Sequence, residues 1–286
     1  MGLHRPITIG RIDYANVWPI FHYAKQMLPD SRYIIDKRVP SALNGAIQRG
    51  EVDITAMSSF AYAQHADDYL LLPDLSVSAK GRVNSILLFM REPIERVLKG
   101  RIALTATSAT SVHLLQIIMS LYYGASPSYV TMEPDLDSML QHADAALLIG
   151  DPAIQASWQE QGLTVLDLGE LWRKWTGCGM TFALLAVRKA TAAERPEEVA
   201  AVLHALSESK RRSLLNPQPL IDQACRQLGG ERAYWSRYFQ ELSYDFGAEE
   251  QAGLQLYFNY AQQLRLLPHE VRMQFFIDDT AIRVNE

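Results

Sequence analysis

Apolar runs of strand length alternate with stretches of helical spacing along the first ninety residues. The predicted strands are residues 7–12, 33–39 and 52–57. The predicted helices are residues 18–26, 41–49 and 59–64, and the second of these opens at Pro40-Ser41 and closes at Gly50. Strand–helix alternation is typical of a largely parallel sheet whose two faces are covered. This pattern predicts an α/β fold.

A second α/β unit follows, and the last third of the chain then becomes helical. Further strands are predicted at residues 83–90, 101–104, 145–149 and 182–187. A helix over residues 112–123 ends at Gly124. The later predicted helices are 196–212, 217–228, 231–242 and 249–266, and a strand-like run returns only at 273–278. No repeat or low-complexity linker separates these units, so we expect no flexible tether between them.

The order of these elements predicts two lobes between which the chain crosses twice. Residues 1–89 and 187–286 are predicted to form lobe one, and residues 90–186 are predicted to form lobe two. The crossings are expected at the strands "SILLFMRE" and "FALLAVRK". Strand crossings between lobes suit a hinge, and a cleft between lobes is a common ligand site.

Composition and charge narrow the class of partner. Of the 286 residues, 48% are hydrophobic and 21% are charged, as in an ordinary globular protein, and the formal net charge of -5 argues against nucleic acid or an anionic membrane as the main partner. No apolar stretch is long enough to span a membrane, and no secretory signal is visible, so we expect a cytoplasmic protein. Cys178 and Cys225 are interpreted most simply as two isolated thiols in a reducing compartment.

Most catalytic motifs are absent. The sequence contains no HExxH, no GxSxG, no GxGxxG and no Walker A pattern, so neither a metal nor a nucleotide cofactor is indicated. The run "HADD" at residues 65–68 has ligand-type side chains, and we interpret it as a surface cap. The functional site must therefore be built from other residue types.

Polar turns rich in small hydroxyl and amide side chains follow several predicted strands. They lie at residues 13–16, 57–59, 84–85, 107–111 and 150–151. Several of them lead directly into helices, whose N-terminal N–H groups hold carboxylates or phosphates well. Any one of these side chains could simply cap its helix. Five such turns on one cleft predict a small anionic ligand, with two carboxylates as one possibility.

Six segments in one order resemble a known family. They are "IGRIDYANVWPIF", "PSALNGAIQRGEVDITAMSSFAYA", "LLPDLSVSAKGRVNSILLF", "LTATSATSVHLLQII", "AALLIGDPAI" and "DLGELWRKWTG". Over residues 7–189 the chain resembles the chorismate dehydratase family of the futalosine pathway of menaquinone biosynthesis. The resemblance implies a two-lobed fold of the type II periplasmic-binding-protein kind. It also implies that dianionic chorismate loses water to give 3-[(1-carboxyvinyl)oxy]benzoate, without a metal or organic cofactor.

The resemblance also implies a set of site residues. Asn16 would orient the substrate while the enolpyruvyl carboxylate of chorismate removes the proton, although Asn16 could instead cap the helix that Pro19 helps to start. Asp151 is the candidate base on the protein, and its alternative role is a strand-end cap or an interlobe contact. The expected substrate-binding residues are Ser58, Ser59, Ser85, Ser108, Thr110, Ser111 and Gly150.

One segment departs from the family, and three other functions remain open. Gly179 follows Cys178 where we expect a proline and large apolar residues, and an extra glycine should loosen this loop. A 1,4-dihydroxy-6-naphthoate synthase of the same pathway is disfavoured because an "SPCPND"-like block is absent. A solute-binding protein for a small anion, without catalysis, is permitted by the fold. A ligand sensor is also permitted, but no effector segment is visible. The sequence leaves the oligomeric state undetermined.

Overall fold

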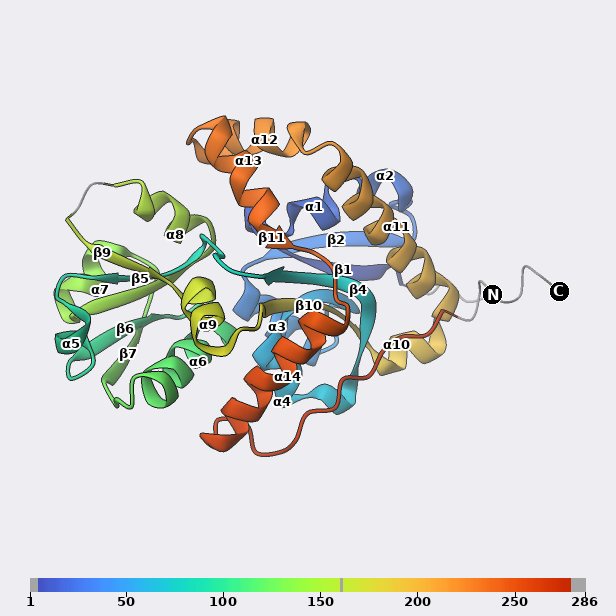
Figure 1. Ribbon diagram of the computed structural model, residues 1–286. Coiled ribbons are helices and arrows are strands. Elements are labelled where there is room, and N and C mark those ends of the chain that lie inside the picture. The colour runs from blue at the N-terminus through green and yellow to red at the C-terminus, as the bar shows by residue number, and fades with distance from the viewer. Residues whose placement is uncertain (1–4, 160–161, 279–286) are drawn as a thin grey trace.

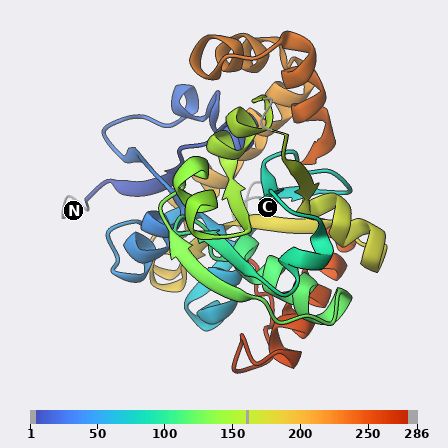
Figure 2. The same cartoon turned by 90° about the vertical axis from the view of Figure 1, so that its left-hand side faces the viewer.

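The chain folds into two lobes, each built around its own β-sheet (Figure 1). This computed structural model describes residues 5–159 and 162–278. Lobe one holds a six-stranded sheet in the order β11-β4-β10-β3-β1-β2, and lobe two holds a five-stranded sheet in the order β7-β6-β8-β5-β9. Figure 2 shows the molecule from the side of lobe two, with the α12–α13 hairpin projecting at the top.

The sheet of lobe one combines parallel and antiparallel pairs. Its strands are β1 (Ile7–Ile12), β2 (Tyr33–Arg38), β3 (Ile54–Ser58), β4 (Tyr69–Ala79), β10 (Met180–Arg188) and β11 (Leu242–Ser243). β1 runs parallel to β2 and β3, whereas β10 is antiparallel to both β3 and β4. The predicted strands of the first ninety residues that belong to this sheet, β1, β2 and β3, are thus parallel as expected, and the strand that returns from lobe two enters the sheet in the opposite direction.

Helices cover both faces of this sheet. In Figure 1, α1, α2 and α11 lie above it, and α3, α4 and α14 lie below it. The helices of lobe one are α1 (Trp18–Phe21), α2 (Ala24–Met27), α3 (Pro40–Gln48), α4 (Ser59–Gln64), α10 (Lys189–Glu194), α11 (Pro196–Leu215), α12 (Gln218–Leu228), α13 (Arg232–Glu241) and α14 (Ala248–Gln263), with short 3₁₀ turns η1 (Ala15–Val17) and η2 (Ala66–Asp68).

Lobe two repeats the design on a smaller scale. Its strands are β5 (Ile86–Met90), β6 (Arg101–Thr105), β7 (Ser128–Met132), β8 (Ala145–Ile149) and β9 (Thr164–Asp167). Its helices are α5 (Ile94–Val97), α6 (Thr110–Ile117), α7 (Leu136–His142), α8 (Gly150–Ser157) and α9 (Leu168–Thr176), and α6 continues as the π-helix η3 (Ile118–Tyr122). Every residue of β5 and β8 is buried, as expected of central strands covered on both faces.

The chain crosses between the lobes in loops that precede the strands expected to cross. β5 belongs to the sheet of lobe two and β10 to that of lobe one, so residues 86–89 lie with lobe two and residues 180–186 with lobe one. The first crossing, residues 80–85, is anchored by the Asp167 carboxylate, which accepts the backbone N–H groups of Val83 at 3.1 Å and Asn84 at 2.7 Å. Asn84 adopts a left-handed conformation there, with φ 57°.

Several elements differ from the sequence pattern. β4, the longest strand among the described residues, was not predicted, because Pro73 and the left-handed Asp74 (φ 56°) interrupt its pattern at a bulge in the pairing with β10. The helix expected over residues 18–26 is split into α1 and α2. The strand-like run near the end makes only a single bridge, between Leu71 and Phe275.

The described residues contain no helix long and apolar enough to cross a membrane. Both cysteines are free thiols, as the sequence suggested. One large apolar core runs through lobe one and into lobe two, and a smaller core around Phe89 and Met139 lies in lobe two. The sheets are thus rigid supports, and the segments that connect them carry the polar groups considered next.

Candidate active site

The two lobes meet where β1 and β8 end. The Asp151 side chain, in the first turn of α8, accepts the backbone N–H of Ala15 at 3.0 Å. The Tyr14 ring lies against Gly150, so close that a Cβ on Gly150 would stand 2.6 Å from Cδ2 of the ring. Burial raises the pKa of the Tyr14 phenol, and the nearby Thr107 side chain of lobe two opposes this shift. The turn after β1 therefore contacts two strand-end turns of the opposite lobe.

Asp151 is the ionisable group at this contact. Burial raises the pKa of its carboxyl to about 6, the N–H of Ala15 opposes this shift, and the neighbouring Asp13 carboxylate adds to it. A carboxyl with such a pKa changes charge near neutrality. The structure thus shows Asp151 as an interlobe contact, which was one of the two roles open to it. Its geometry leaves the other role, a proton acceptor, as a proposal.

Asn16 has an amide that the protein leaves unused. Its Oδ1 atom is buried and has no hydrogen-bond partner among the described residues. Neither η1 nor α1 has a side-chain cap, so the alternative that Asn16 caps the helix beginning near Pro19 was wrong. A buried acceptor without a partner costs free energy unless a ligand or water satisfies it. An amide can accept from a substrate hydroxyl and donate to a carboxylate.

Ser85 lies beneath the turn that carries Asp151. Its carbonyl accepts the N–H of Gly150 at 2.7 Å, which fixes the start of α8. Its hydroxyl donates to the Val83 carbonyl at 3.2 Å and accepts from the Tyr238 hydroxyl at 3.2 Å. Ser85 thus joins the first crossing, α8 and α13 at a single residue.

Two of the serines predicted to bind substrate, Ser58 and Ser59, are hydrogen-bonded to other residues of lobe one. Ser58 and Asn44 bond reciprocally: the Asn44 amide donates to Ser58 Oγ at 3.0 Å, and Ser58 N–H donates to Asn44 Oδ1 at 3.3 Å. Ser59 Oγ donates to the Thr181 carbonyl at 2.8 Å, and its side chain is fully buried. These bonds tie α4 to α3 and β10. Neither hydroxyl is exposed at the surface of this structure.

The hydroxyls of the turn before α6 hold helix ends. Ser108 Oγ accepts the N–H of Ser111 at 3.2 Å, in the manner of a cap. Thr110 Oγ1 accepts the N–H of Phe60, in the first turn of α4, at 2.9 Å. Thr110 of lobe two therefore satisfies an N-terminal N–H of a helix in lobe one. That part of the α4 N-terminus is closed to an anion in this structure.

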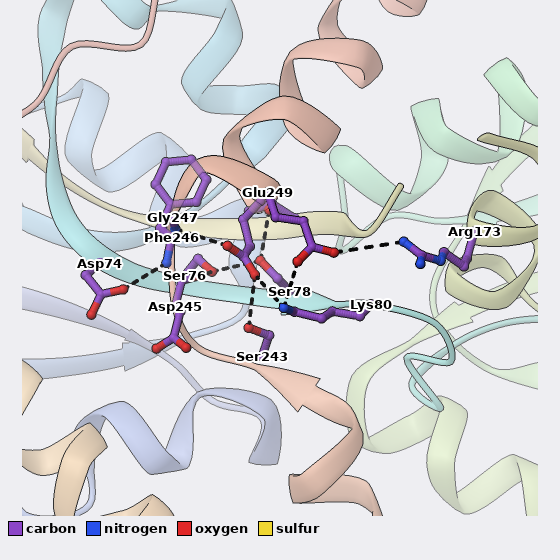
Figure 3. Close-up of polar contacts among 12 residues, drawn as sticks. Asp74, Ser76, Ser78, Lys80, Arg173, Ser243, Asp245, Phe246, Gly247 and Glu249 are labelled. Atoms are coloured by element: carbon purple, nitrogen blue, oxygen red, sulfur yellow. Dashed lines mark hydrogen bonds and ion pairs between the residues drawn. The ribbon is translucent and has the colours of Figure 1, made fainter. Parts of the chain in front are cut away.

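Charged side chains link the lobes on the side of α9 and α14 (Figure 3). Lys80 Nζ, at the start of the first crossing, lies 2.9 Å from Glu249 Oε2 of α14 and 3.6 Å from Glu250 Oε1. Arg173 of α9 approaches the same Glu249 carboxylate at 4.0 Å. Glu249 therefore lies between a crossing segment and a helix of the other lobe, which is where a hinge would act.

The loop around Gly179 is packed closely, contrary to the expectation that it is loose. The Gly179 carbonyl accepts the indole N–H of Trp172 at 3.1 Å. A Cβ on Gly253 would come within 2.3 Å of the Gly179 carbonyl oxygen, and a Cβ on Gly179 would stand 3.0 Å from the carbonyl oxygen of Ala79. The extra glycine therefore allows β10, β4 and α14 to approach one another.

Tyr238 was not among the predicted site residues, whereas Tyr14 and Thr107 lie in two of the predicted polar turns, residues 13–16 and 107–111, without a role assigned to either. Tyr14 and Thr107 lie inside segments that carried the resemblance, so their position was available as a signal. Tyr238 lies in a helix far along the chain, and no local pattern indicates that it reaches Ser85. The described residues hold no cluster of histidine, cysteine and carboxylate side chains that could bind a metal ion.

The site combines a buried acceptor, a carboxyl that titrates near neutrality and hydroxyls held by other hydroxyls. Thr105 and Thr107, for example, share a hydrogen bond of 2.8 Å between their side chains. Such an arrangement can orient a small polar anion and transfer a proton.

Comparisons with known proteins agree on a family. A family model described as menaquinone biosynthesis matches residues 7–263. A chorismate dehydratase of Thermus thermophilus is 33% identical in an alignment of 268 residues that covers 88% of this chain and 94% of the relative.

Solved structures share the fold at lower identity. A protein of Archaeoglobus fulgidus superposes with a TM-score of 0.75 at 22% identity, covering 92% of this chain and 98% of its own. The periplasmic aliphatic sulphonate-binding protein of Escherichia coli gives a TM-score of 0.66 at 18% identity, covering 94% and 90%. An alkanesulfonate-binding protein of Xanthomonas axonopodis, bound to MOPS, gives 0.70 at 16% identity, covering 95% and 97%. The periplasmic-binding-protein-like fold expected from the sequence is confirmed.

Proposed function

The chain belongs to the menaquinone-biosynthesis family, and on that premise we propose that it is a chorismate dehydratase, a carbon–oxygen lyase that forms 3-[(1-carboxyvinyl)oxy]benzoate. The observation that carries the proposal is the match, over most of both chains, to a relative of that name. The site agrees with it, because it offers an unused amide and an ionisable carboxyl in one buried contact between lobes.

The reaction removes one water molecule and leaves an aromatic ring. The hydrogen leaves the ring carbon that carries the enolpyruvyl ether, the hydroxyl leaves the neighbouring carbon, and the electron pair of the broken C–H bond completes the ring. Aromatisation supplies the driving force, so the protein needs to hold the substrate, guide the proton and exclude competing reactions. We expect it to do so without a metal or an organic cofactor.

Asn16 is proposed to orient chorismate. Its buried Oδ1 has no hydrogen-bond partner among the described residues, so a substrate hydroxyl that donates to it would satisfy this acceptor. The amide N–H₂ can at the same time donate to a substrate carboxylate. In this arrangement the enolpyruvyl carboxylate of chorismate itself takes the proton, because an amide cannot act as a base near neutrality.

Asp151 is proposed to couple chemistry to closure. Its bond to Ala15 N–H exists only when the turn after β1 lies against α8. At pH values above about 6 its carboxyl is mainly ionised, and it is then also able to accept a proton. Two proton acceptors are thus possible in the closed site, the substrate carboxylate and Asp151, and we favour the substrate carboxylate.

The remaining predicted residues are proposed to act as a framework. Four of them are buried, and their side-chain or backbone groups are hydrogen-bonded to other protein groups in this structure: Ser58, Ser59, Thr110 and Ser111. Ser85 is bonded through its backbone carbonyl to Gly150, the residue before Asp151. As a biosynthetic enzyme of this family, the protein is proposed to act in the cytoplasm.

A solute-binding role is the second candidate, and the sulphonate-binding neighbours favour it on fold alone. Purified protein is incubated with chorismate in EDTA, and products are followed by mass spectrometry and ultraviolet absorption. A product lighter by one water, with a benzoate spectrum, supports the dehydratase. Chorismate recovered intact, together with a higher melting temperature, supports the binding protein. No change in either measurement would mean that this site takes another ligand.

A further inference from the structure

Helix α13 brings a tyrosine from the last third of the chain into the site. The Tyr238 side chain is 1% exposed, and its hydroxyl donates to Ser85 Oγ at 3.2 Å across 153 positions of sequence. α13 belongs to lobe one, whereas Ser85 ends the crossing that leads into lobe two. The contact therefore joins the C-terminal helices to the segment that starts α8.

Ser85 transmits this contact to the turn that carries Asp151. Its carbonyl accepts the N–H of Gly150, the residue immediately before Asp151, at 2.7 Å. The order of contacts is thus Tyr238 hydroxyl, Ser85, Gly150 and Asp151. A change in the Ser85 conformation would move the end of α8 on which the interlobe bond depends.

The Tyr238 hydroxyl is held in its neutral form. Burial raises the pKa of this phenol well above its usual value, and the nearby Asp151 carboxylate adds to the effect although the Ser85 hydrogen bond opposes it. A phenol that does not ionise remains a hydrogen-bond donor throughout the working pH range. Tyr238 therefore stays an uncharged donor to Ser85.

We propose that Tyr238 is a positioning residue for dehydration, whose hydroxyl fixes Ser85 so that the Ser85 proton turns from the Val83 carbonyl to a substrate oxygen when chorismate binds. This inference rests on the proposed function and adds a residue and a role to it. Tyr238 does not touch the reacting atoms in this account. It acts through Ser85.

The hydrogen-bonding capacity of a serine hydroxyl determines how Ser85 can respond to a substrate. A hydroxyl has one proton and two acceptor positions. Tyr238 fills one acceptor position, and the proton now goes to Val83 in a bond of 3.2 Å. A substrate oxygen would compete with that carbonyl for the same proton. Without the Tyr238 hydroxyl, Ser85 loses its donor and can rotate into other positions.

Two neighbouring tyrosines provide matched controls. The Tyr234 ring stacks on that of Tyr238 in the same helix, with centroids 6.2 Å apart, and its buried hydroxyl has no partner among the described residues. The Tyr244 hydroxyl is also buried and has no partner there. Replacing either by phenylalanine removes the same atom from a similar setting without touching Ser85.

The test compares chorismate turnover by the wild-type protein and by Tyr238→Phe, Tyr234→Phe and Tyr244→Phe. The account predicts that Tyr238→Phe lowers kcat about 10-fold with little change in KM, whereas the two controls keep the wild-type kcat. The double variant Tyr238→Phe/Ser85→Ala should be no slower than Ser85→Ala alone, because both changes remove the same hydrogen bond between Tyr238 and Ser85. Melting temperatures verify that each variant is folded.

The outcomes separate the two proposals. If the wild-type protein turns over chorismate and Tyr238→Phe behaves like Tyr234→Phe, the role of Tyr238 is overturned and the dehydratase stands. Additive losses in the double variant would also overturn the role, because Tyr238 would then act independently of Ser85. A wild-type protein that leaves chorismate intact overturns the proposed function, and the role of Tyr238 with it.

Discussion

The Asp151 carboxylate accepts the backbone N–H of Ala15 at 3.0 Å, and this bond joins the first helical turn of α8 in lobe two to the turn after β1 in lobe one. It lies one residue from Asn16 on one side and one residue from Gly150 on the other. Any change in the charge of Asp151 therefore acts on the contact that closes the proposed active site.

Replacing Asp151 by asparagine should stabilise the protein at neutral pH. The folded-state pKa is raised from 3.8 to about 6, so the protonated carboxyl is favoured in the folded protein, and its contribution is complete below pH 4 and lost as pH rises through 6. The amide avoids this loss and can still accept from Ala15. Unfolding in urea should show a gain of about 3 kcal/mol for Asp151→Asn at pH 8 and little gain at pH 4.

Asp30→Asn provides the control for this experiment, because Asp30 is exposed and makes only a long contact with Lys25. The Asp30→Asn substitution removes one carboxylate charge, as Asp151→Asn does, but from the protein surface. A gain for Asp151→Asn that is equal at pH 4 and pH 8 would show that the Asp151 carboxyl is not strained by burial.

Adding a methyl group at Gly150 should prevent closure. The Cβ would stand 2.6 Å from Tyr14 Cδ2, and φ is 64° at this position. Gly124→Ala is the matched control, since Gly124 has the same φ and nothing within 4 Å of the added Cβ. Each change should cost about 1 kcal/mol of unfolding free energy through the backbone. Only Gly150→Ala should also raise the KM for chorismate, and equal KM values in the two variants would contradict the contact's role in substrate binding.

The sequence predicted the two-lobed architecture better than the hydrogen-bond partners of individual side chains. Continuous apolar strands such as β5 and β8 were visible because both of their faces are buried. β4 was missed because Pro73 and Asp74 break its pattern, and the lobe boundaries shifted because crossing occurs in loops such as residues 80–85. The local pattern of hydrophobic and polar residues indicates buried strands and turns well. It does not record which distant strand a segment joins.

Partners that are distant in sequence explain why the candidate site was only partly predictable. Thr110 was expected to cap its own helix or bind a ligand, yet it accepts from Phe60 at the start of a helix in the other lobe. Tyr238 reaches Ser85 over 153 positions. Asn16, by contrast, keeps a buried oxygen without a hydrogen-bond partner among the described residues, and a ligand that donates to this oxygen would satisfy it.

Changing Asn16 to aspartate should impair the enzyme strongly. The new carboxylate would face a dianionic substrate and the neighbouring Asp13, and it would lose the amide donor. We expect kcat/KM for chorismate to fall about 100-fold or more, measured from initial rates. Asn259→Asp adds the same charge at an exposed position of α14 and should leave the rate unchanged. Wild-type kinetics in Asn16→Asp would refute the orienting role.

Removing the charge of Glu249 should loosen the lobes. This carboxylate lies between Lys80, at the start of the first crossing, and Arg173 of α9 in lobe two. Because these side chains are exposed, the effect on unfolding should be small, and the effect on lobe separation should be the visible one. Small-angle scattering should give Glu249→Gln a larger radius of gyration than Glu208→Gln, whose ion pairs lie within α11 alone. Equal radii would mean that these pairs do not restrain the lobes.

The most direct test of the whole account uses chorismate carrying deuterium at the ring carbon that bears the enolpyruvyl ether. Purified protein and labelled chorismate are mixed, and the product is examined by mass spectrometry. The account predicts an aromatic product that has lost both the hydroxyl and the deuterium. A product that keeps the deuterium, or labelled chorismate recovered unchanged, would contradict it.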